Sequence, residues 1–392
     1  MEEKNKKPHL IINFDINKTI LLADKSKNFN VEKGVRSCIV DYAWGLYDES
    51  SKKWTLTEKN LSHKKPKDNL INYYDYMQKI HPMKKEHEIP DIDERFKKNQ
   101  ELQKLKNNLS LEFVNKNQPG EQLHDIYLDI LNKLKIPKNI MDEIQKDNSK
   151  YSKFYKSLFQ DGYIYLFHSL FQFIIDLQKQ NRTYTLVFRT FGQDFNEVVQ
   201  EYNSFCKGMH PIYPDIYFDG THNSKDYRIK DNNRGLFYRF DDDINNLFLV
   251  IGTFKRYQVK TPDELYSKYQ DEVNQGKVSI IKGGKNIFEF VTNSSVEGKF
   301  NSFCLNDHYE TWYKHGKKSR YGKPMLVDPD NKNVDVYFFD DNIDKTETSI
   351  VDCRNVVNGE VITDKEFRSK FLIIADTIKA AVDESYYINK VI

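Results

Sequence analysis

The chain has 392 residues, of which 39% are hydrophobic and 30% are charged, and its formal net charge is +2. A chain of this length and composition suffices for a core domain with one or two additional domains or insertions. It lacks the excess of basic residues that is typical of proteins that bind the phosphates of nucleic acid. No stretch reaches the roughly 20 apolar residues of a membrane helix. The charged segment 1–10 is unlike a signal peptide, and the four cysteines form no CxxC pair. We therefore expect a cytoplasmic protein with reduced thiols that binds neither nucleic acid nor membrane. The sequence does not determine its oligomeric state.

The first predicted element is a buried strand over the apolar run 10–14, which stops at one carboxylate, Asp15. Asn17 and Thr19 follow within the next four residues. An Asp in this place either begins a turn, which Asp favours, or belongs to a site at the carboxyl edge of a parallel sheet, where ligands bind.

A long charged region separates this strand from the next. Residues 29–160 are predicted to be mostly helical, because apolar residues recur there at helical spacing. An apolar helix over 164–179 then leads into a strand over 183–190, which ends at Thr190. Helix, short break and apolar strand are typical of a parallel α/β sheet. Thr190 is therefore a candidate site residue, although Thr is common at any strand end.

The second half begins with a β-rich segment. Two strands around a polar turn are predicted in "RGLFYRFDDDINNLFLVIGTF", and another hairpin in "KVSIIKGGKNIFEFVT". The α/β pattern returns with a helix over 306–316 and a strand over 335–342. A closing helix is predicted over 364–387.

Polar side chains follow three of these apolar strands, at Asp15, Thr190, and the pair Asp340 and Asp341. The carboxyl ends of parallel strands meet at one edge of a sheet, so these side chains can converge. Three carboxylates at one edge would repel each other unless a cation lay between them. All-oxygen ligands favour Mg²⁺ over zinc.

Four segments of the chain resemble the four sequence motifs of the haloacid dehalogenase (HAD-like) superfamily, whose members are mostly magnesium-dependent phosphatases. In chain order the motifs are matched by "FDINKT", "LVFRT", "GKPMLV" and "VYFFDDNID". The resemblance implies a Rossmann-like, three-layer α/β core with a central parallel sheet. Asp15 would be the nucleophile that forms an aspartyl phosphate, with Thr190 and Lys323 binding the phosphate; a neighbouring lysine remains an alternative to Lys323. The implied Mg²⁺ ligands are Asp15, the backbone carbonyl of Asn17, Asp340, and Asp341 or Asp344.

The first motif departs from the family pattern at Asn17. The phosphatases carry a second Asp there, which protonates the leaving group and then activates water. An amide cannot move a proton at neutral pH, and general acid–base help is worth roughly 10²–10⁴-fold in rate. Two functions remain open: a Mg²⁺-dependent phosphatase or phosphotransferase, or a catalytically weak or inactive HAD-fold binding protein, a pseudophosphatase.

The long gaps between the motifs predict two insertions. We expect a HAD-like core of residues 1–24, 160–207 and 301–392, a helical cap over 25–159 and a β-containing insertion over 208–300. By analogy with the family, large caps imply a small, soluble phosphorylated substrate, because a protein substrate could not enter the site.

Overall fold

The structure is a computed structural model that divides into two compact units. It describes residues 7–23, 29–146, 151, 153–192, 195–253, 255–343 and 350–392. The first unit contains Met1–Leu21, Pro137–Leu158 and Leu166–Ile392, and the second contains Leu22–Ile136 and Phe159–Tyr165. The predicted residue Asp344 lies outside the described residues.

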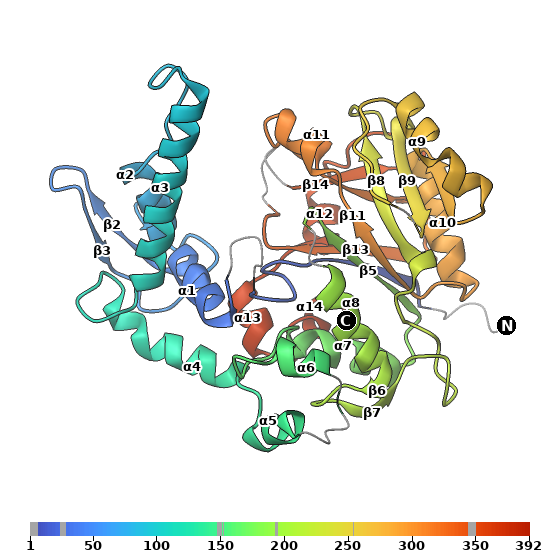
Figure 1. Cartoon of the computed structure of the whole chain (residues 1–392), viewed down its shortest axis with the longest axis horizontal. Coiled ribbons are helices and arrows are strands. Elements are labelled where there is room, and N and C mark those ends of the chain that lie inside the picture. Colours follow the sequence, from blue (N-terminus) through green and yellow to red (C-terminus); the bar gives the residue numbers. More distant parts are fainter. Residues whose placement is uncertain are drawn as a thin grey trace. The chain divides into compact units, whose positions relative to one another are not determined.

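The first unit is built on an eight-stranded sheet in the order β10-β9-β8-β11-β5-β1-β13-β15. Figure 1 labels β5, β8, β9, β11 and β13 of this sheet. From β8 to β15 in that order every neighbouring pair is parallel, and β9 and β10 add antiparallel pairs at one edge. The fold is therefore mixed α/β with a mostly parallel central sheet. Its strands are β1 (His9–Asp15), β5 (Tyr184–Thr190), β8 (Arg234–Arg239), β9 (Leu247–Gly252), β10 (Val278–Lys282), β11 (Ser302–Asn306), β13 (Val334–Asp340) and β15 (Leu372–Ile374).

Helices pack on both faces of this sheet. On one face Phe14 of β1 contacts Phe173 of α7 and Tyr387, with ring centroids 5.9 and 4.9 Å away. On the other face Ile11 of β1 and Ile287 of α10 line the same small cavity. The unit therefore has three layers. Its helices are α5 (Lys138–Gln145), α6 (Lys153–Leu158), α7 (His168–Lys179), α8 (Phe195–Cys206), α9 (Pro262–Asn274), α10 (Gly284–Val296), α11 (Tyr309–Lys314), α12 (Lys365–Phe371), α13 (Thr377–Val382) and α14 (Ile388–Val391).

The register brings the ends of the central strands level. Phe14 pairs with Phe339 of β13, and Asp15 pairs with Arg189 of β5. All seven residues of β1 are buried, as expected for a parallel strand covered on both faces. The last residues of β1, β5 and β13 consequently lie together at the carboxyl edge of the central sheet.

Two smaller pairings complete the first unit. Strands β12 (Lys323–Val327) and β14 (Val351–Asn355) pair parallel outside the central sheet, and β6 (Lys207–Met209) and β7 (Pro214–Tyr217) form a short antiparallel pair. Single 3₁₀ turns occur at Asp231–Asn233, Ile244–Asn246 and Ser319–Tyr321.

Two sequence predictions for this unit are wrong. The expected hairpin over residues 277–292 is strand β10 followed by helix α10, because Gly283, at φ 90°, turns the chain and buried Ile287 and Phe288 then continue at helical spacing. The expected closing helix over 364–387 is broken by β15, because this segment pairs with β13. The strands of segment 208–300 are present, and β8, β9 and β10 extend the central sheet.

The second unit combines helices with a small sheet that the sequence analysis did not predict. Strands β2 (Trp44–Asp48), β3 (Lys53–Leu56) and β4 (Ile71–Asn72) pair in the order β3-β2-β4. Trp54, Tyr73 and Phe113 form its aromatic core, with centroids of Tyr73 and Phe113 4.2 Å apart. The helices are α1 (Val31–Tyr42), α2 (Tyr73–Ile80), α3 (Ile92–Glu112) and α4 (His124–Leu134), with a 3₁₀ turn at Glu121–Leu123.

Bilayer-spanning helices are not found in the described ranges, because none of the helices there is both long enough and apolar enough.

Replacing Phe14 by Ala tests how much the aromatic packing around the end of β1 stabilises the first unit. Phe14 is fully buried and stacks on Phe339 with centroids 5.1 Å apart. We expect Phe14→Ala to lower the free energy of unfolding of the first unit by about 3–5 kcal/mol. The control Tyr313→Ala removes a 60% exposed ring and should change it by less than about 1 kcal/mol. Equal urea midpoints for the two variants would contradict the packing described here.

Candidate functional site

The turn after β1 is held by contacts with distant parts of the chain. Thr377 Oγ1 donates a 2.5 Å hydrogen bond to the carbonyl of Lys18, and the Tyr387 hydroxyl donates to the carbonyl of Thr19. Lys18 has a positive φ of 60°, and its amide donates to the Leu21 carbonyl at 2.9 Å. This tight turn leaves the Asp15 carboxylate at the end of the strand.

Lys323 places its amine between two carboxylates at this edge. Its Nζ donates hydrogen bonds to Asp15 Oδ1 and, at 2.7 Å, to Asp340 Oδ2. The lysine side chain is only 1% exposed. Burial alone would lower the pKa of Lys323, but the charges of Asp15, Asp340 and Asp307 together raise it above its usual value. The neighbouring carboxylates therefore favour the protonated, positively charged form of this amine.

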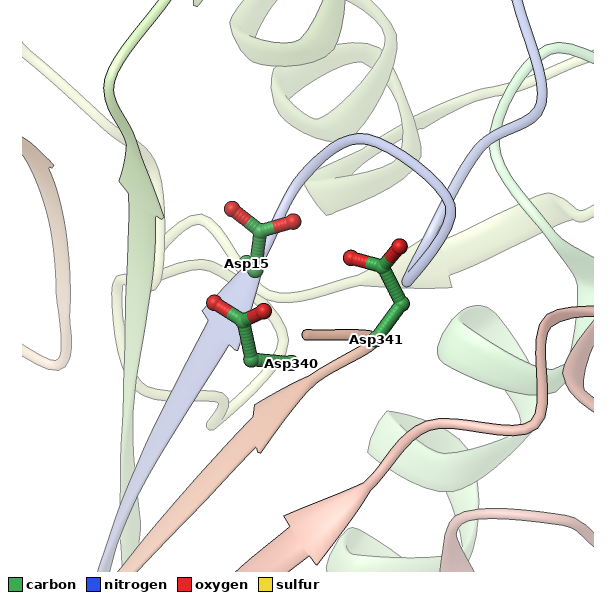
Figure 2. A group of neighbouring side chains, drawn as sticks. All are labelled: Asp15, Asp340 and Asp341. Carbon is green, nitrogen blue, oxygen red and sulfur yellow. The ribbon is translucent and has the colours of Figure 1, made fainter. Parts of the chain in front are cut away.

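Three carboxylates gather at this edge of the sheet, and Figure 2 shows how they lie. One oxygen each from Asp15, Asp340 and Asp341 lies within 4.8 Å of the other two. Asp340 and Asp15 are buried, and Asp341 is half-buried. The backbone amide of Asn342 holds Asp340 Oδ1 at 2.9 Å, and the Asn342 side chain donates to Asp341 Oδ1 at 2.8 Å. The carboxylates of two neighbouring strands thus face a common space.

The electrostatics of this cluster favour a bound cation. Burial raises the pKa of Asp15 to about 7, although the charge of Lys323 lowers it. Burial also raises the pKa of Asp341 well above its usual value, and the charges of Asp340 and Asp15 raise it further. A cation held by these oxygens would remove both penalties, and an all-carboxylate donor set suits Mg²⁺. The residues present therefore fit a magnesium ion.

Two buried arginines hold the backbone on either side of Lys323. Arg239 of β8 donates a hydrogen bond to the carbonyl of Gly322 at 3.2 Å, and Arg189 of β5 donates to the carbonyl of Pro324 at 3.0 Å. A Cβ on Gly322 would lie 2.0 Å from the carbonyl oxygen of Ile350 in the neighbouring chain segment, so only glycine fits. These contacts anchor β12 to the central sheet.

Both arginines are paired with buried acids. Arg189 forms a bidentate pair with Asp307, with Nε 3.1 Å from Oδ2, and also donates to Asn13 Oδ1 at 3.2 Å. Arg239 pairs with Asp352 at 2.5 Å, and Arg354 binds the same carboxylate at 2.8 Å. Burial raises the pKa of Asp307, and Arg189 opposes that effect.

The other predicted site residues also lie near this edge, with different contacts. Thr190 ends β5, and its Oγ1 accepts a hydrogen bond from the Gly192 amide at 2.8 Å, so its hydroxyl proton can be donated elsewhere. Asn17 lies half-buried in the turn after Asp15, and its backbone forms an isolated bridge with Leu21. Among the lysines of segment 314–323, which are Lys314, Lys317, Lys318 and Lys323, it is Lys323 that contacts Asp15.

Sequence reasoning missed Arg189, Asp307 and Phe191. Arg189 interrupts the apolar run "LVFRT", and a charge inside a buried strand needs a partner. Asp307 follows the apolar run "SFCLN" much as Asp15 follows its own strand. Phe191 directly follows Thr190, and its ring centroid lies 5.3 Å from Lys323 Nζ. No pattern in the chain distinguished it from other aromatic residues.

Comparison with known proteins adds no relative: no family model, no curated protein and no solved structure matches the chain.

The raised pKa of Asp15 predicts a pH-dependent effect of Mg²⁺ on stability. The pKa of about 7 in the folded protein exceeds the ordinary Asp value of 3.8, so the metal-free protein loses stability as pH rises from about 4 through 7. Protons compete with Mg²⁺ for the Asp15 carboxylate at pH 5, below this pKa, and not at pH 8, above it. At 100 times its Kd, Mg²⁺ should stabilise the protein by about 2.7 kcal/mol at pH 8.

Thermal unfolding with and without Mg²⁺ at the two pH values measures this effect. We expect the rise in Tm to be larger at pH 8, to vanish in Asp340→Asn and to persist in the control Asp330→Asn, which alters an exposed turn. A rise of the same size at pH 5 would argue against a cation on these carboxylates.

The buried pair Arg189–Asp307 predicts a large stability effect. Replacing Asp307 by Asn leaves the arginine charge buried without its partner, and we expect a loss of about 3–5 kcal/mol in free energy of unfolding. The same substitution at Asp242, whose pair with Arg320 is about half exposed, should cost at most about 1 kcal/mol. Denaturant unfolding of the two variants makes the comparison, and similar losses would refute it.

Proposed function

We propose that this protein is a Mg²⁺-dependent hydrolase or phosphotransferase of the HAD-like superfamily that acts on a small phosphorylated substrate. The observation that carries the proposal is the grouping of Asp15, Asp340 and Asp341 within 4.8 Å, with Lys323 bonded to two of them. A buried nucleophilic carboxylate, an oxygen-rich cation site and a fixed ammonium are the parts that phosphoryl transfer through an aspartyl phosphate requires.

The proposed reaction has two displacements. In the first, an Asp15 oxygen attacks phosphorus, and the bond from phosphorus to the leaving oxygen breaks with its electron pair on that oxygen. In the second, water attacks the phosphorus of the aspartyl phosphate, and the Asp15 carboxylate leaves as inorganic phosphate forms; in a phosphotransferase an acceptor hydroxyl replaces water.

The chain's own groups have separate roles in this scheme. Lys323 neutralises negative charge on Asp15 and on the phosphoryl group, and the Thr190 hydroxyl donates to a phosphoryl oxygen. Asp15, Asp340, Asp341 and the Asn17 carbonyl would hold Mg²⁺. When bound, this ion would orient the phosphoryl group and offset its charge.

Asn17 restricts the substrates that the proposed enzyme can use. An amide cannot protonate a departing alkoxide, so a substrate whose leaving group is already stable as an anion is favoured. Acyl phosphates have such a leaving group. The same residue supports the second candidate, a HAD-fold protein that binds Mg²⁺ and a phosphorylated ligand with little or no turnover.

Other features support the proposed compartment and the proposed substrate size. The four cysteines are all buried free thiols, which supports a cytoplasmic, reducing location. The long segment between the first two motifs, most of which forms the second unit, supports a small substrate by analogy with capped family members.

Phosphate release from acetyl phosphate and from p-nitrophenyl phosphate tests the proposal. We expect Mg²⁺-dependent release that is greater with acetyl phosphate. Asp15→Asn should lower the rate by at least about 10³-fold because it removes the nucleophile, whereas the exposed control Asp330→Asn should leave it unchanged. Asn17→Asp should speed hydrolysis of the ester by up to about 10²-fold by restoring a proton donor.

The two candidate functions give different results in this assay. If wild type and Asn17→Asp release no phosphate from either compound while calorimetry shows Mg²⁺ binding that Asp340→Asn removes, the binding protein is the better account. If Asp15→Asn retains full activity, the proposed nucleophile is wrong.

A further inference from the structure

A second cavity opens at the edge of the sheet opposite Asp15. It lies at His9 and Val334, where β1 and β13 begin, and at Thr183, the residue before β5, and it has a volume of about 380 Å³. The seven residues of β1 separate the two edges by about 20 Å. Cavities of about 300–1,000 Å³ accommodate small organic ligands. Its lining residues are Lys7, His9, Thr183, Lys225, Thr292, Ser295, Val296, Asn331, Asn333 and Val334.

The lining supplies positive charge and hydrogen-bond donors without any carboxylate. Lys7 and Lys225 contribute amines, and within the described ranges neither forms an ion pair. The acid that follows Lys225 in the chain, Asp226, is already bonded to Arg228 at 2.9 Å and to Lys230 at 2.7 Å. The lysine amines are therefore available to a ligand, and the charge of the cavity complements an anion.

Buried polar groups form the inner wall. His9, Thr292 and Ser295 are 8%, 8% and 1% exposed. Ser295 donates to the Val291 carbonyl one helical turn back, at 2.6 Å, whereas no hydrogen-bond partner is found for Thr292 Oγ1 in the described part of the chain. A buried hydroxyl without a partner costs about 1–3 kcal/mol.

We propose that this cavity binds a small organic anion that carries phosphate or carboxylate groups. The lysine amines meet the charged groups, and the Thr, Ser and Asn side chains meet hydroxyl or further anionic oxygens. The site is separate from the carboxylate cluster, which without a cation repels anions. The inference is independent of the catalytic proposal.

Calorimetric titration of the full chain with pyrophosphate and with citrate tests this site. The buffer is freed of metal on a chelating resin and contains chloride as the only other anion, so the carboxylate cluster does not bind the probe. We expect one binding event per chain with at least one probe. Tighter pyrophosphate binding identifies a phosphorylated ligand class, and tighter citrate binding identifies a carboxylate one.

Val296 permits a matched pair of variants, because it lines the cavity and is 63% exposed. Val296→Glu adds a negative charge at the rim and should weaken binding at least tenfold, whereas the neutral Val296→Gln should stay within threefold of wild type. Removing both amines in Lys7→Ala with Lys225→Ala should weaken binding similarly, and Lys332→Ala, which lies outside the lining, should not.

The absence of binding heat with both probes would overturn the proposal, and so would equal affinity in Val296→Glu and Val296→Gln. Asp15→Asn should bind the probe as wild type does; loss of binding in that variant would place the anion at the carboxylate cluster instead. Phosphate-release activity does not enter these measurements, so failure of the catalytic proposal leaves their result unaffected.

Discussion

The carboxyl edge of the sheet depends on one buried ion cluster, in which the Lys323 amine bridges Asp15 and Asp340. Parallel strands in register bring their terminal acids together whether or not the charges are compatible. One ammonium cannot balance Asp15, Asp340 and Asp341, so the ionised cluster keeps a negative excess. That excess raises the pKa values of Asp15 and Asp341 together with burial, and it makes the same place attractive to a divalent cation.

The precision of this cluster comes from a second level of buried charges. Lys323 belongs to β12, which is outside the central sheet, yet Arg239 and Arg189 bind the carbonyls on either side of it. Each arginine is neutralised by its own acid, Asp352 or Asp307. Buried ion pairs of this kind contribute little net stability relative to apolar packing. Their consequence here is positional, because they hold the lysine against two strands of the sheet.

The two edges of the sheet have opposite electrostatic character. The carboxyl edge concentrates acids and suits a cation, whereas the amino edge carries Lys7, Lys225 and His9 around a cavity without carboxylates. Under the proposed function, Asn17 would leave the binding of a cation and a phosphoryl group intact and would reduce proton transfer alone. The carboxylates and the lysine act through charge, and these charges do not depend on the residue at position 17.

The sequence by itself determined the buried strands and the acids that end them, because a continuous apolar run followed by Asp is unusual and locally readable. It predicted β1, β5 and β13, and through them Asp15, Thr190 and Asp340. Only the tertiary structure decided the rest. The segment after Gly283 is a helix and Leu372–Ile374 is a strand because of their partners, and local pattern does not encode partners. The choice of Lys323 among neighbouring lysines, and the pairing of Arg189 with Asp307 across 118 residues, likewise depend on distances that exist only after folding.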